Sequence, residues 1–235
     1  RVYQFHRKLT PYEDSSGATL VLPANRSFEV QSALNHRLTQ RLRGRARVDY
    51  FSDILTQQLY HQNIYQATRS TRVIDGSLSG TFGRAAMSAQ YQRNEYLRGT
   101  TSSSLYGSTP RLAASIAPQT LFGTPIYASA NTEYAFIPNR ELSDGRVVSD
   151  LSLGKWDLSP SLRAPLSRLT FLSVNTSASY RSTYYSRSLD EDRRLTSDSL
   201  LRQFLTLRAD VIGPVLTKIW DTPESTRTER MKHVI

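Results

Sequence analysis

Few residues in this 235-residue sequence have the types and spacing that covalent catalysis requires. The sequence contains no cysteine, which excludes thiol nucleophiles, disulfides and cysteine-ligated metal sites. Its four histidines are scattered between His6 and His233, without the His-Glu-x-x-His spacing of a zinc hydrolase. The segment Gly76–Gly80 has the glycine spacing of a nucleophile elbow, but Leu78 stands where the serine should be. We therefore expect no enzyme activity, no cofactor and no metal site.

The arginines offer a different chemistry, the binding of anions. Lysine and arginine number 30 against 20 aspartate and glutamate, which gives a formal net charge of +10. Arg43, Arg45 and Arg47 alternate with apolar residues, so a β-strand places all three on one face, where guanidinium groups can bind phosphate oxygens. Other arginines expected on polar strand faces are Arg84, Arg181, Arg202 and Arg208. An alternative role for all of them is neutralisation, because the same faces carry Glu29, Asp49, Asp75, Glu133 and Asp210.

Apolar residues recur at every second position over most of the chain, which predicts β-strands with one apolar and one polar face. The main expected strands are residues 27–37, 42–51, 70–82, 84–97, 124–136, 168–183 and 198–212. Most exceed the typical strand length of about 5–6 residues, which favours a membrane barrel over a soluble sandwich. The residues expected to face lipid are Phe28, Val30, Leu34, Val48, Tyr50, Leu78, Phe82, Met87, Tyr91, Ile126, Tyr134, Leu172, Val174, Tyr180, Leu205 and Leu207.

The expected links between strands alternate in length. Short links are expected at residues 38–41, 83, 118–123 and 164–167, and long links at 52–69, 98–109, 137–145 and 184–197. This alternation is typical of an up-and-down transmembrane barrel with short periplasmic turns and longer outer loops. We therefore predict an all-β fold, the antiparallel up-and-down wall of an incomplete transmembrane β-barrel. Residues 1–26 are expected to form leading strands or a connecting segment, and residues 27–235 to be part of the barrel domain of a longer chain.

Several segments carry a family resemblance. They read Val-Asp-Tyr-Phe-Ser-Asp at 48–53, Tyr-Ala-Ser-Ala-Asn-Thr-Glu-Tyr at 127–134, Leu-Ser-Pro-Ser-Leu-Arg-Ala-Pro-Leu-Ser at 158–167, Phe-Leu-Ser-Val at 171–174 with Ser-Tyr-Arg at 179–181, and Arg-Met-Lys-His-Val-Ile at 230–235. In this order they resemble the C-terminal barrel of the lipopolysaccharide-assembly outer-membrane proteins known as LptD or OstA. The last segment is similar to the start of that family's Arg-x-x-His-x-Ile-Glu-Pro segment.

This resemblance implies a protein of the Gram-negative outer membrane that inserts lipopolysaccharide into the outer leaflet. The implied partners are lipopolysaccharide, outer-membrane lipid, an LptE-like plug lipoprotein, an LptA-like periplasmic bridge that meets an upstream domain, and the barrel-assembly machinery. On this interpretation the arginine face lines a basic lumen that the anionic headgroup passes. The family's structural disulfides have no counterpart, since the chain lacks cysteine.

Two other functions fit some of these features. Another outer-membrane barrel, such as a porin or a gated nutrient transporter, would have the same long alternating strands. A nucleic-acid-binding sheet would use the basic charge and the tyrosines. The arginines are spread over nearly every expected strand, however, and no nucleic-acid reader motif occurs. We therefore expect no nucleic-acid partner.

Overall fold

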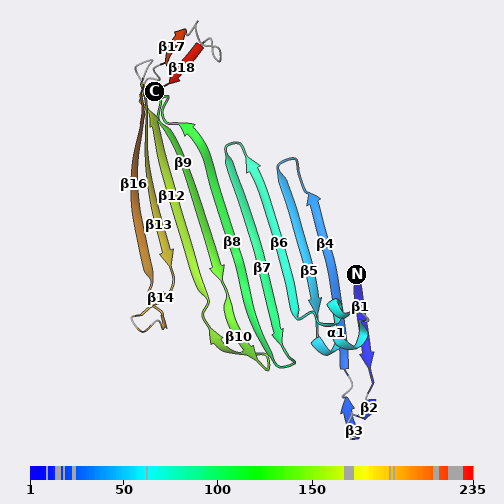
Figure 1. The fold of residues 1–235 in the computed structure, drawn as a ribbon. Coiled ribbons are helices and arrows are strands. Elements are labelled where there is room, and N and C mark those ends of the chain that lie inside the picture. Colours follow the sequence, from blue (N-terminus) through cyan, green and yellow to red (C-terminus); the bar gives the residue numbers. More distant parts are fainter. Residues whose placement is uncertain are drawn as a thin grey trace. The chain divides into compact units, whose positions relative to one another are not determined.

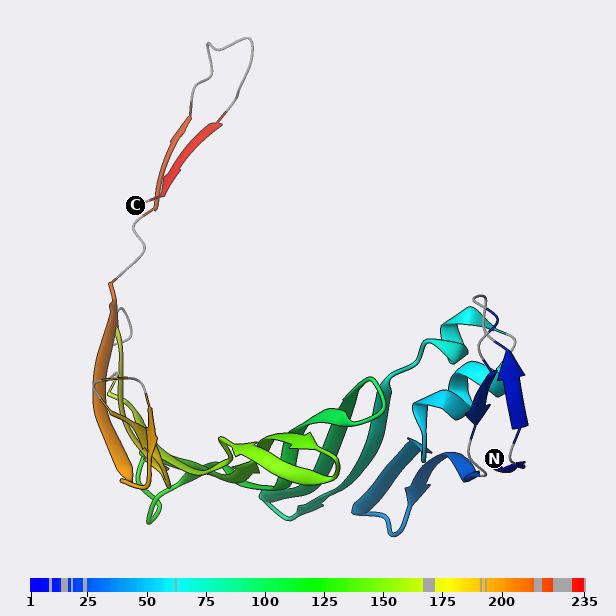
Figure 2. The same ribbon diagram turned by 90° about the horizontal axis from the view of Figure 1, so that it is seen from below.

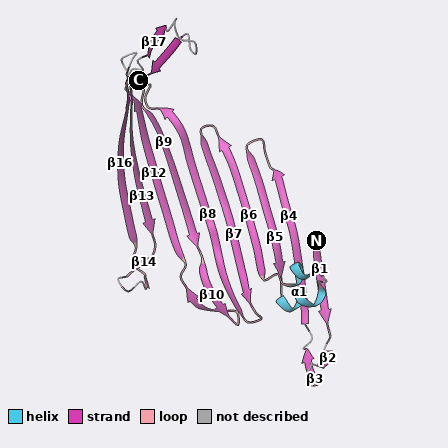
Figure 3. Ribbon diagram, in the orientation of Figure 1, coloured by secondary structure: helices cyan, strands magenta, loops and turns pink. Residues whose placement is uncertain are grey.

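The fold of the chain was obtained as a computed structural model, which describes residues 1–8, 10–13, 17, 19–22, 25–61, 63–166, 172–190, 192, 194–213, 217–221 and 230–234. The fold is all-β with two short helices (Figure 1, Figure 3). Neither helix is long or apolar enough to cross a membrane. Within these residues no group of three or more His, Asp or Glu side chains is placed to hold a metal ion.

The elements follow the chain in a regular succession. They are β1 (Val2–Arg7), β2 (Thr10–Glu13), β3 (Thr19–Leu22), β4 (Asn25–Arg37), β5 (Leu42–Phe51), α1 (Ile54–Tyr60), α2 (Ile64–Ala67), β6 (Thr71–Phe82), β7 (Ala85–Arg98), β8 (Ser102–Thr120), β9 (Tyr127–Ile137), β10 (Asn139–Ser143), β11 (Arg146–Asp150), β12 (Leu153–Pro165), β13 (Ser173–Tyr185), β14 (Ser188–Leu189), β15 (Leu195–Thr196), β16 (Leu200–Ile212), β17 (Thr217–Asp221) and β18 (Arg230–Val234).

Twelve strands form one sheet, in the order β1-β4-β5-β6-β7-β8-β9-β12-β13-β16, with β10 paired to β8 and β11 to β10. The described pairings are antiparallel, and from β4 onward the order in the sheet follows the order in the chain. This is the predicted up-and-down arrangement. The order is linear from β1 to β16, so the sheet is not closed on itself. Small separate hairpins are formed by β2–β3, β14–β15 and β17–β18.

The chain divides into two compact units. Unit 1 comprises Arg1–Ile116, Asn131–Leu158 and Ser182–Arg202, and unit 2 comprises Ala117–Ala130, Ser159–Arg181 and Gln203–Ile235. The faces, clusters and grooves described below each belong to one of these units.

Every main expected strand has a counterpart, although most ends differ by a few residues. The expected strand 42–51 coincides with β5. In the expected strand 168–183, whose counterpart is β13, residues 168–171 lie outside the described part of the chain. β8 and β12 were not among the main expected strands. Short links are confirmed between β4 and β5 and at the Gly83 turn, and long ones between β5 and β6, β9 and β12, and β13 and β16.

The expected long link at residues 98–109 is wrong. β7 and β8 instead continue as a hairpin to its tip, pairing from Gln92↔Ser108 to Arg98↔Ser102. A register shift between Gln90 and Gln92 marks a β-bulge, which accommodates an extra residue on β8. Serine and glycine are poor predictors of strands, so the sequence pattern hid this half of β8.

Gly107 is required by the close approach of the two strands in this hairpin. Its φ is +153°, and a Cβ atom there would collide with the carbonyl oxygen of Gln92. No side chain fits there unless the ladder shifts. Glycine is therefore required for the observed pairing of β7 with β8 beyond the bulge.

Little apolar side-chain surface is buried. Among the described residues the buried hydrophobic side chains are Phe51, Leu105 and Ala135, whereas Met87 is 51% and Leu205 67% exposed. A soluble sheet protein buries its apolar face under a second layer. In this structure the apolar side chains of the strands lie at the surface.

We predict that Gly107→Ala lowers the free energy of unfolding by about 2 kcal/mol, because alanine is strained at this φ and collides with the neighbouring strand. Thermal unfolding followed by circular dichroism measures the change. Gly76→Ala is the matched control, since its Cβ would meet its nearest neighbour, the Arg45 carbonyl oxygen, at an ordinary 3.9 Å. Equal destabilisation by the two substitutions would contradict the role given to Gly107.

Candidate functional site: an apolar face and an arginine face

The strand registers sort the side chains of unit 1 onto two faces, because residues paired directly across strands point to the same side. One ladder of partners runs Gly44↔Leu78 and Leu78↔Ala89. The adjacent ladder runs Arg45↔Ser77 and Ser77↔Gln90. One face is therefore apolar and the other polar across the three neighbouring strands β5, β6 and β7, as the sequence alternation predicts.

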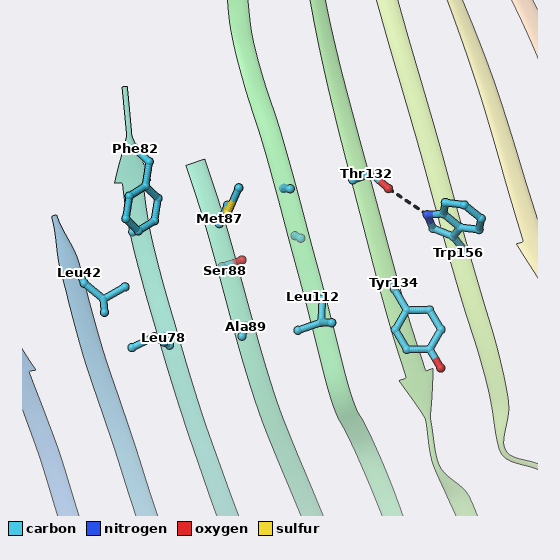
Figure 4. A pocket seen from close by; sticks show the side chains of 13 residues that line it. Leu42, Leu78, Phe82, Met87, Ser88, Ala89, Leu112, Thr132, Tyr134 and Trp156 are labelled. Carbon is cyan, nitrogen blue, oxygen red and sulfur yellow. Dashed lines mark hydrogen bonds between the residues drawn. The ribbon is translucent and has the colours of Figure 1, made fainter. Parts of the chain in front are cut away.

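An open groove of about 730 Å³ lies on the apolar face of unit 1 (Figure 4). Large side chains that line it include Leu42 of β5, Leu78 and Phe82 of β6, Met87 of β7 and Leu112 of β8. Glycine and alanine residues lie between these large side chains, and their small size leaves the space that forms the groove. The remaining lining residues are Gly80, Ser88, Ala89, Ala113, Ala114, Thr132, Tyr134 and Trp156.

The polar groups of Trp156 and Thr132 in this groove are paired with one another. The Trp156 indole N–H donates to Thr132 Oγ1 at 2.9 Å, as Figure 4 shows. Thr132 Oγ1 in turn donates to the carbonyl oxygen of Asp157 at 3.2 Å. The chain of donors thus ends on the backbone. Such pairing removes the cost of placing an indole N–H and a hydroxyl in apolar surroundings.

None of the sixteen residues expected to face lipid is buried. Nine are exposed: Phe28, Leu34, Leu78, Phe82, Met87, Tyr91, Tyr134, Leu205 and Leu207. Seven are half-buried: Val30, Val48, Tyr50, Ile126, Leu172, Val174 and Tyr180. They do not converge on a common dry core. In unit 2 a second apolar groove of about 460 Å³ is lined by residues that include Ile126 and Leu207.

The polar face of unit 1 carries the arginine stripe. Arg43, Arg45 and Arg47 are exposed and pair across to Ser79, Ser77 and Asp75 of β6. On the other side, Arg37 of β4 stands directly opposite Arg43. Like charges directly opposite each other destabilise a sheet. The Arg37 guanidinium donates to the carbonyl oxygens of Thr39 and Gln40 in the following turn, at 3.3 and 2.9 Å.

The other expected arginines have different surroundings. Arg84 lies in the turn between β6 and β7 and not on a strand. Arg181 of β13 is exposed, and the guanidinium of Arg202 lies 5.7 Å from the centre of the Tyr185 ring. Arg208 forms an ion pair of 2.9 Å with Asp210, which is the neutralising arrangement considered above. The structure groups Arg43, Arg45 and Arg47 in one stripe and does not place the other four in it.

A helical insert between β5 and β6 is attached to the arginine face by a buried ion-pair network. Arg69 Nη2 lies 2.8 Å from Glu29 Oε1, and Arg69 Nη1 lies 2.8 Å from Asp49 Oδ1. The Glu29 side chain is 0% exposed. One guanidinium therefore joins two carboxylates on neighbouring strands, and its fork geometry suits that bridge.

The helices of the insert add further contacts to this network. His61, after α1, places Nε2 at 2.9 Å from Glu29 Oε2, and Gln57 of α1 is fully buried. The Asp53 side chain accepts from Leu55 N and begins α1, while the Asn63 side chain accepts from Tyr65 N and begins α2. Figure 2 shows both helices, in cyan, beside the blue strands β4 and β5. The insert covers one end of the arginine face.

A second charged cluster ends the apolar face at the same end of the strands as the insert. Glu95 lies 3.3 Å from Arg72 and 3.9 Å from Arg93, and it accepts a hydrogen bond of 3.0 Å from Ser103. The Arg72 guanidinium also lies 4.9 Å from the centre of the Tyr50 ring. These residues have the parity of Leu78 and Met87, so the apolar face changes abruptly to charged and aromatic residues.

Asp150 stabilises the β10–β11 hairpin in its ionised form. Hydrogen bonds from the Ser152 side chain and backbone, with a smaller contribution from Arg140, hold the pKa of Asp150 below its ordinary value. A depressed pKa favours the folded hairpin at neutral pH, and this contribution is lost as the pH falls through the folded-state pKa.

Sequence patterns alone do not indicate Arg37, Arg69, Gln57, Arg72 or Arg93 as site residues. Arg69 and Gln57 fall in an expected long link, where the local signals are the N-cap residues Asp53 and Asn63. The sequence did contain a signal for Arg72 and Arg93, because each is a charged residue at a position where the alternation of its strand calls for an apolar one. Arg37 can be placed opposite Arg43 only when the strand register is known, and the four-residue turn between β4 and β5 sets that register.

Comparison with known proteins adds no family assignment. No protein-family model and no curated protein matches this chain.

We predict that Arg69→Gln destabilises the insert by about 3–4 kcal/mol, because it leaves the Glu29 carboxylate buried without its main counter-charge. Thermal unfolding and limited proteolysis at residues 52–70 would measure this. Arg47→Gln is the control, since Arg47 is 60% exposed and lies 3.9 Å from Asp49. The network would have no such importance if both variants were cleaved as slowly as the unmodified chain, or if adding Glu29→Gln to Arg69→Gln restored nothing.

Proposed function

We propose that this chain forms part of the wall of an outer-membrane β-barrel that inserts lipopolysaccharide into the outer leaflet, as the resemblance to the LptD or OstA family implies. The apolar face meets lipid and the arginine face meets a hydrated lumen. The chain carries out no covalent chemistry in this role. The plug lipoprotein, the periplasmic bridge and the barrel-assembly machinery are its proposed partners.

The observation that carries this proposal is the exposure of a continuous apolar face on long strands. Leu78 is 39% and Met87 51% exposed, and they lie on neighbouring strands of one sheet. β5 has 10 residues and β6 has 12, and a tilted strand needs about 9–11 to cross a bilayer. Water is a poor solvent for such a face, whereas hydrocarbon tails suit it.

The edge of the apolar face also supports a membrane location. Tyr50 and Tyr91 lie next to Arg72 and Arg93 where the apolar residues end. Tyrosine and arginine are favoured at headgroup level, where a ring or aliphatic stem meets hydrocarbon and a polar tip meets water. Within the groove, the paired Trp156 and Thr132 avoid the penalty that an unsatisfied donor would carry in lipid.

The arginine face supports an anionic cargo. Arg37, Arg43, Arg45 and Arg47 gather on two adjacent strands, with Asp75 as the directly opposed acidic residue on β6. Lipopolysaccharide carries phosphates and acidic sugars, which guanidinium groups bind in paired hydrogen bonds. A porin or a nutrient transporter would have the same membrane wall but would not carry lipopolysaccharide. Measuring the delivery of lipopolysaccharide to the cell surface therefore distinguishes these functions from the proposed one.

We predict that Leu78→Arg blocks insertion into a bilayer, because an arginine near the midplane of a lipid-facing wall costs about 2–4 kcal/mol. Ser77→Arg, one residue away on the opposite face, should insert normally. Heat-modifiable migration on gels after reconstitution into vesicles measures insertion. If Ser77→Arg blocked insertion while Leu78→Arg did not, the faces would be assigned the wrong way round.

We predict that replacing Arg43, Arg45 and Arg47 together with glutamine reduces the lipopolysaccharide that reaches the cell surface. The triple lysine variant should have an intermediate effect, since it keeps the charge but loses the bidentate fork. Surface labelling of lipopolysaccharide in cells depleted of the native protein measures delivery, and immunoblotting confirms equal amounts of the variants. Depletion that leaves surface lipopolysaccharide unchanged while altering small-solute uptake would favour a porin or transporter.

A further inference from the structure

The strongest unexplained feature of unit 1 is the charged cluster that ends the apolar face. Arg72 is engaged by the Phe51 and Ser52 carbonyl oxygens as well as by Glu95, and its side chain is 13% exposed. Arg93 has a looser contact of 3.9 Å with the same carboxylate, and its side chain is 42% exposed. Two guanidinium groups thus share one carboxylate. The cluster keeps one positive charge in excess, and Arg93 presents it at the surface.

Arg93 and the apolar groove lie on one face and along one strand. On β7, Met87 and Ala89 line the groove, and Tyr91 and Arg93 follow on the same parity. At roughly 3.3 Å per residue, Arg93 stands about 13 Å beyond Ala89. Tyr91 stands between Ala89 and Arg93 on this face, and because its partner on β6 is Gly76, its ring is the one large side chain of that pair beside a lipid that reaches from the groove to Arg93.

We infer that this groove and Arg93 together bind one anionic phospholipid, with its acyl chains in the groove and its phosphate on the Arg93 guanidinium. The inference rests on the proposed function, because it needs the apolar face to be in a bilayer. The groove volume, about 730 Å³, falls within the range of about 300–1,000 Å³ that is usual for small-ligand sites. The excess positive charge at its end complements the net negative charge of an anionic phospholipid, whereas a zwitterionic lipid already carries its own cation beside the phosphate.

Lipid retention by the full chain tests this directly. The chain is reconstituted into phosphatidylcholine vesicles with a minor fraction of phosphatidylglycerol, extracted in mild detergent, and the lipids that remain bound are identified by mass spectrometry. We expect phosphatidylglycerol to be enriched over its vesicle fraction. Arg93→Gln should reduce this enrichment about fivefold, the upper end for one exposed ion pair, and Arg93→Lys should retain most of it.

Arg98→Gln is the matched control, because Arg98 is an exposed arginine of the same strand on the opposite parity. Its enrichment of phosphatidylglycerol should equal that of the unmodified chain. Ala114→Phe, which fills the groove, should lower retention although every charge is kept. Both variants are compared only after a gel shift has shown that they insert.

Three results would overturn the inference. Equal retention of the two lipids by the unmodified chain, or an unchanged enrichment in Arg93→Gln, would refute the lipid site while leaving the membrane wall intact. A chain that never inserts into the vesicles would refute the proposed function and the lipid site together.

Discussion

The whole structure depends on one constraint, that a single sheet has two faces and each needs a solvent. Alternation along a strand sends successive side chains to opposite sides, so long alternating strands separate apolar from charged residues along most of their length. In this chain no buried hydrophobic core resolves the separation, since only Phe51, Leu105 and Ala135 are buried hydrophobic residues in its described part. The described strands leave the apolar face uncovered, and the hydrocarbon of a membrane is the cover that we propose for it.

The polar interactions are arranged around this constraint. Buried charges occur where they are compensated, as Glu29 is by Arg69 and His61 on the arginine face. On the opposite face, Glu95 is compensated by Arg72 at the point where the apolar residues end. Both networks lie toward the end of the strands that carries the insert. That end therefore holds the buried ion pairs, while the turns at residues 38–41 and 83–84 close the other end with short links.

Much of this arrangement could be predicted from the sequence, and the reason is the exact period of a strand. Val48, Leu78 and Met87 were assigned to the correct common face because each alternates with polar neighbours, and β5 was predicted from end to end. The first half of β8 was missed, because its run of serines with Gly107 and Pro110 carries no clear alternation. Arg69 was missed for a different reason. Its partners Glu29 and Asp49 are distant in sequence, and only the pairing of β4 with β5 brings them together. The alternation predicts an apolar and a charged face, whereas the cargo that we propose comes from the family resemblance.

The absence of cysteine allows the central claim to be measured residue by residue. Single cysteines can be introduced along β6 from Ile74 to Phe82, and each variant reconstituted and labelled with a fluorophore sensitive to a lipid-dissolved quencher. Position 80 stays glycine, because a Cβ atom there would lie 2.9 Å from the Arg41 carbonyl oxygen. We predict that labels at positions 74, 76, 78 and 82 are quenched from the hydrocarbon phase, while labels at 75, 77, 79 and 81 respond only to a water-soluble quencher. Equal response of both sets to the water-soluble quencher would contradict it, because the apolar face would then not be in lipid.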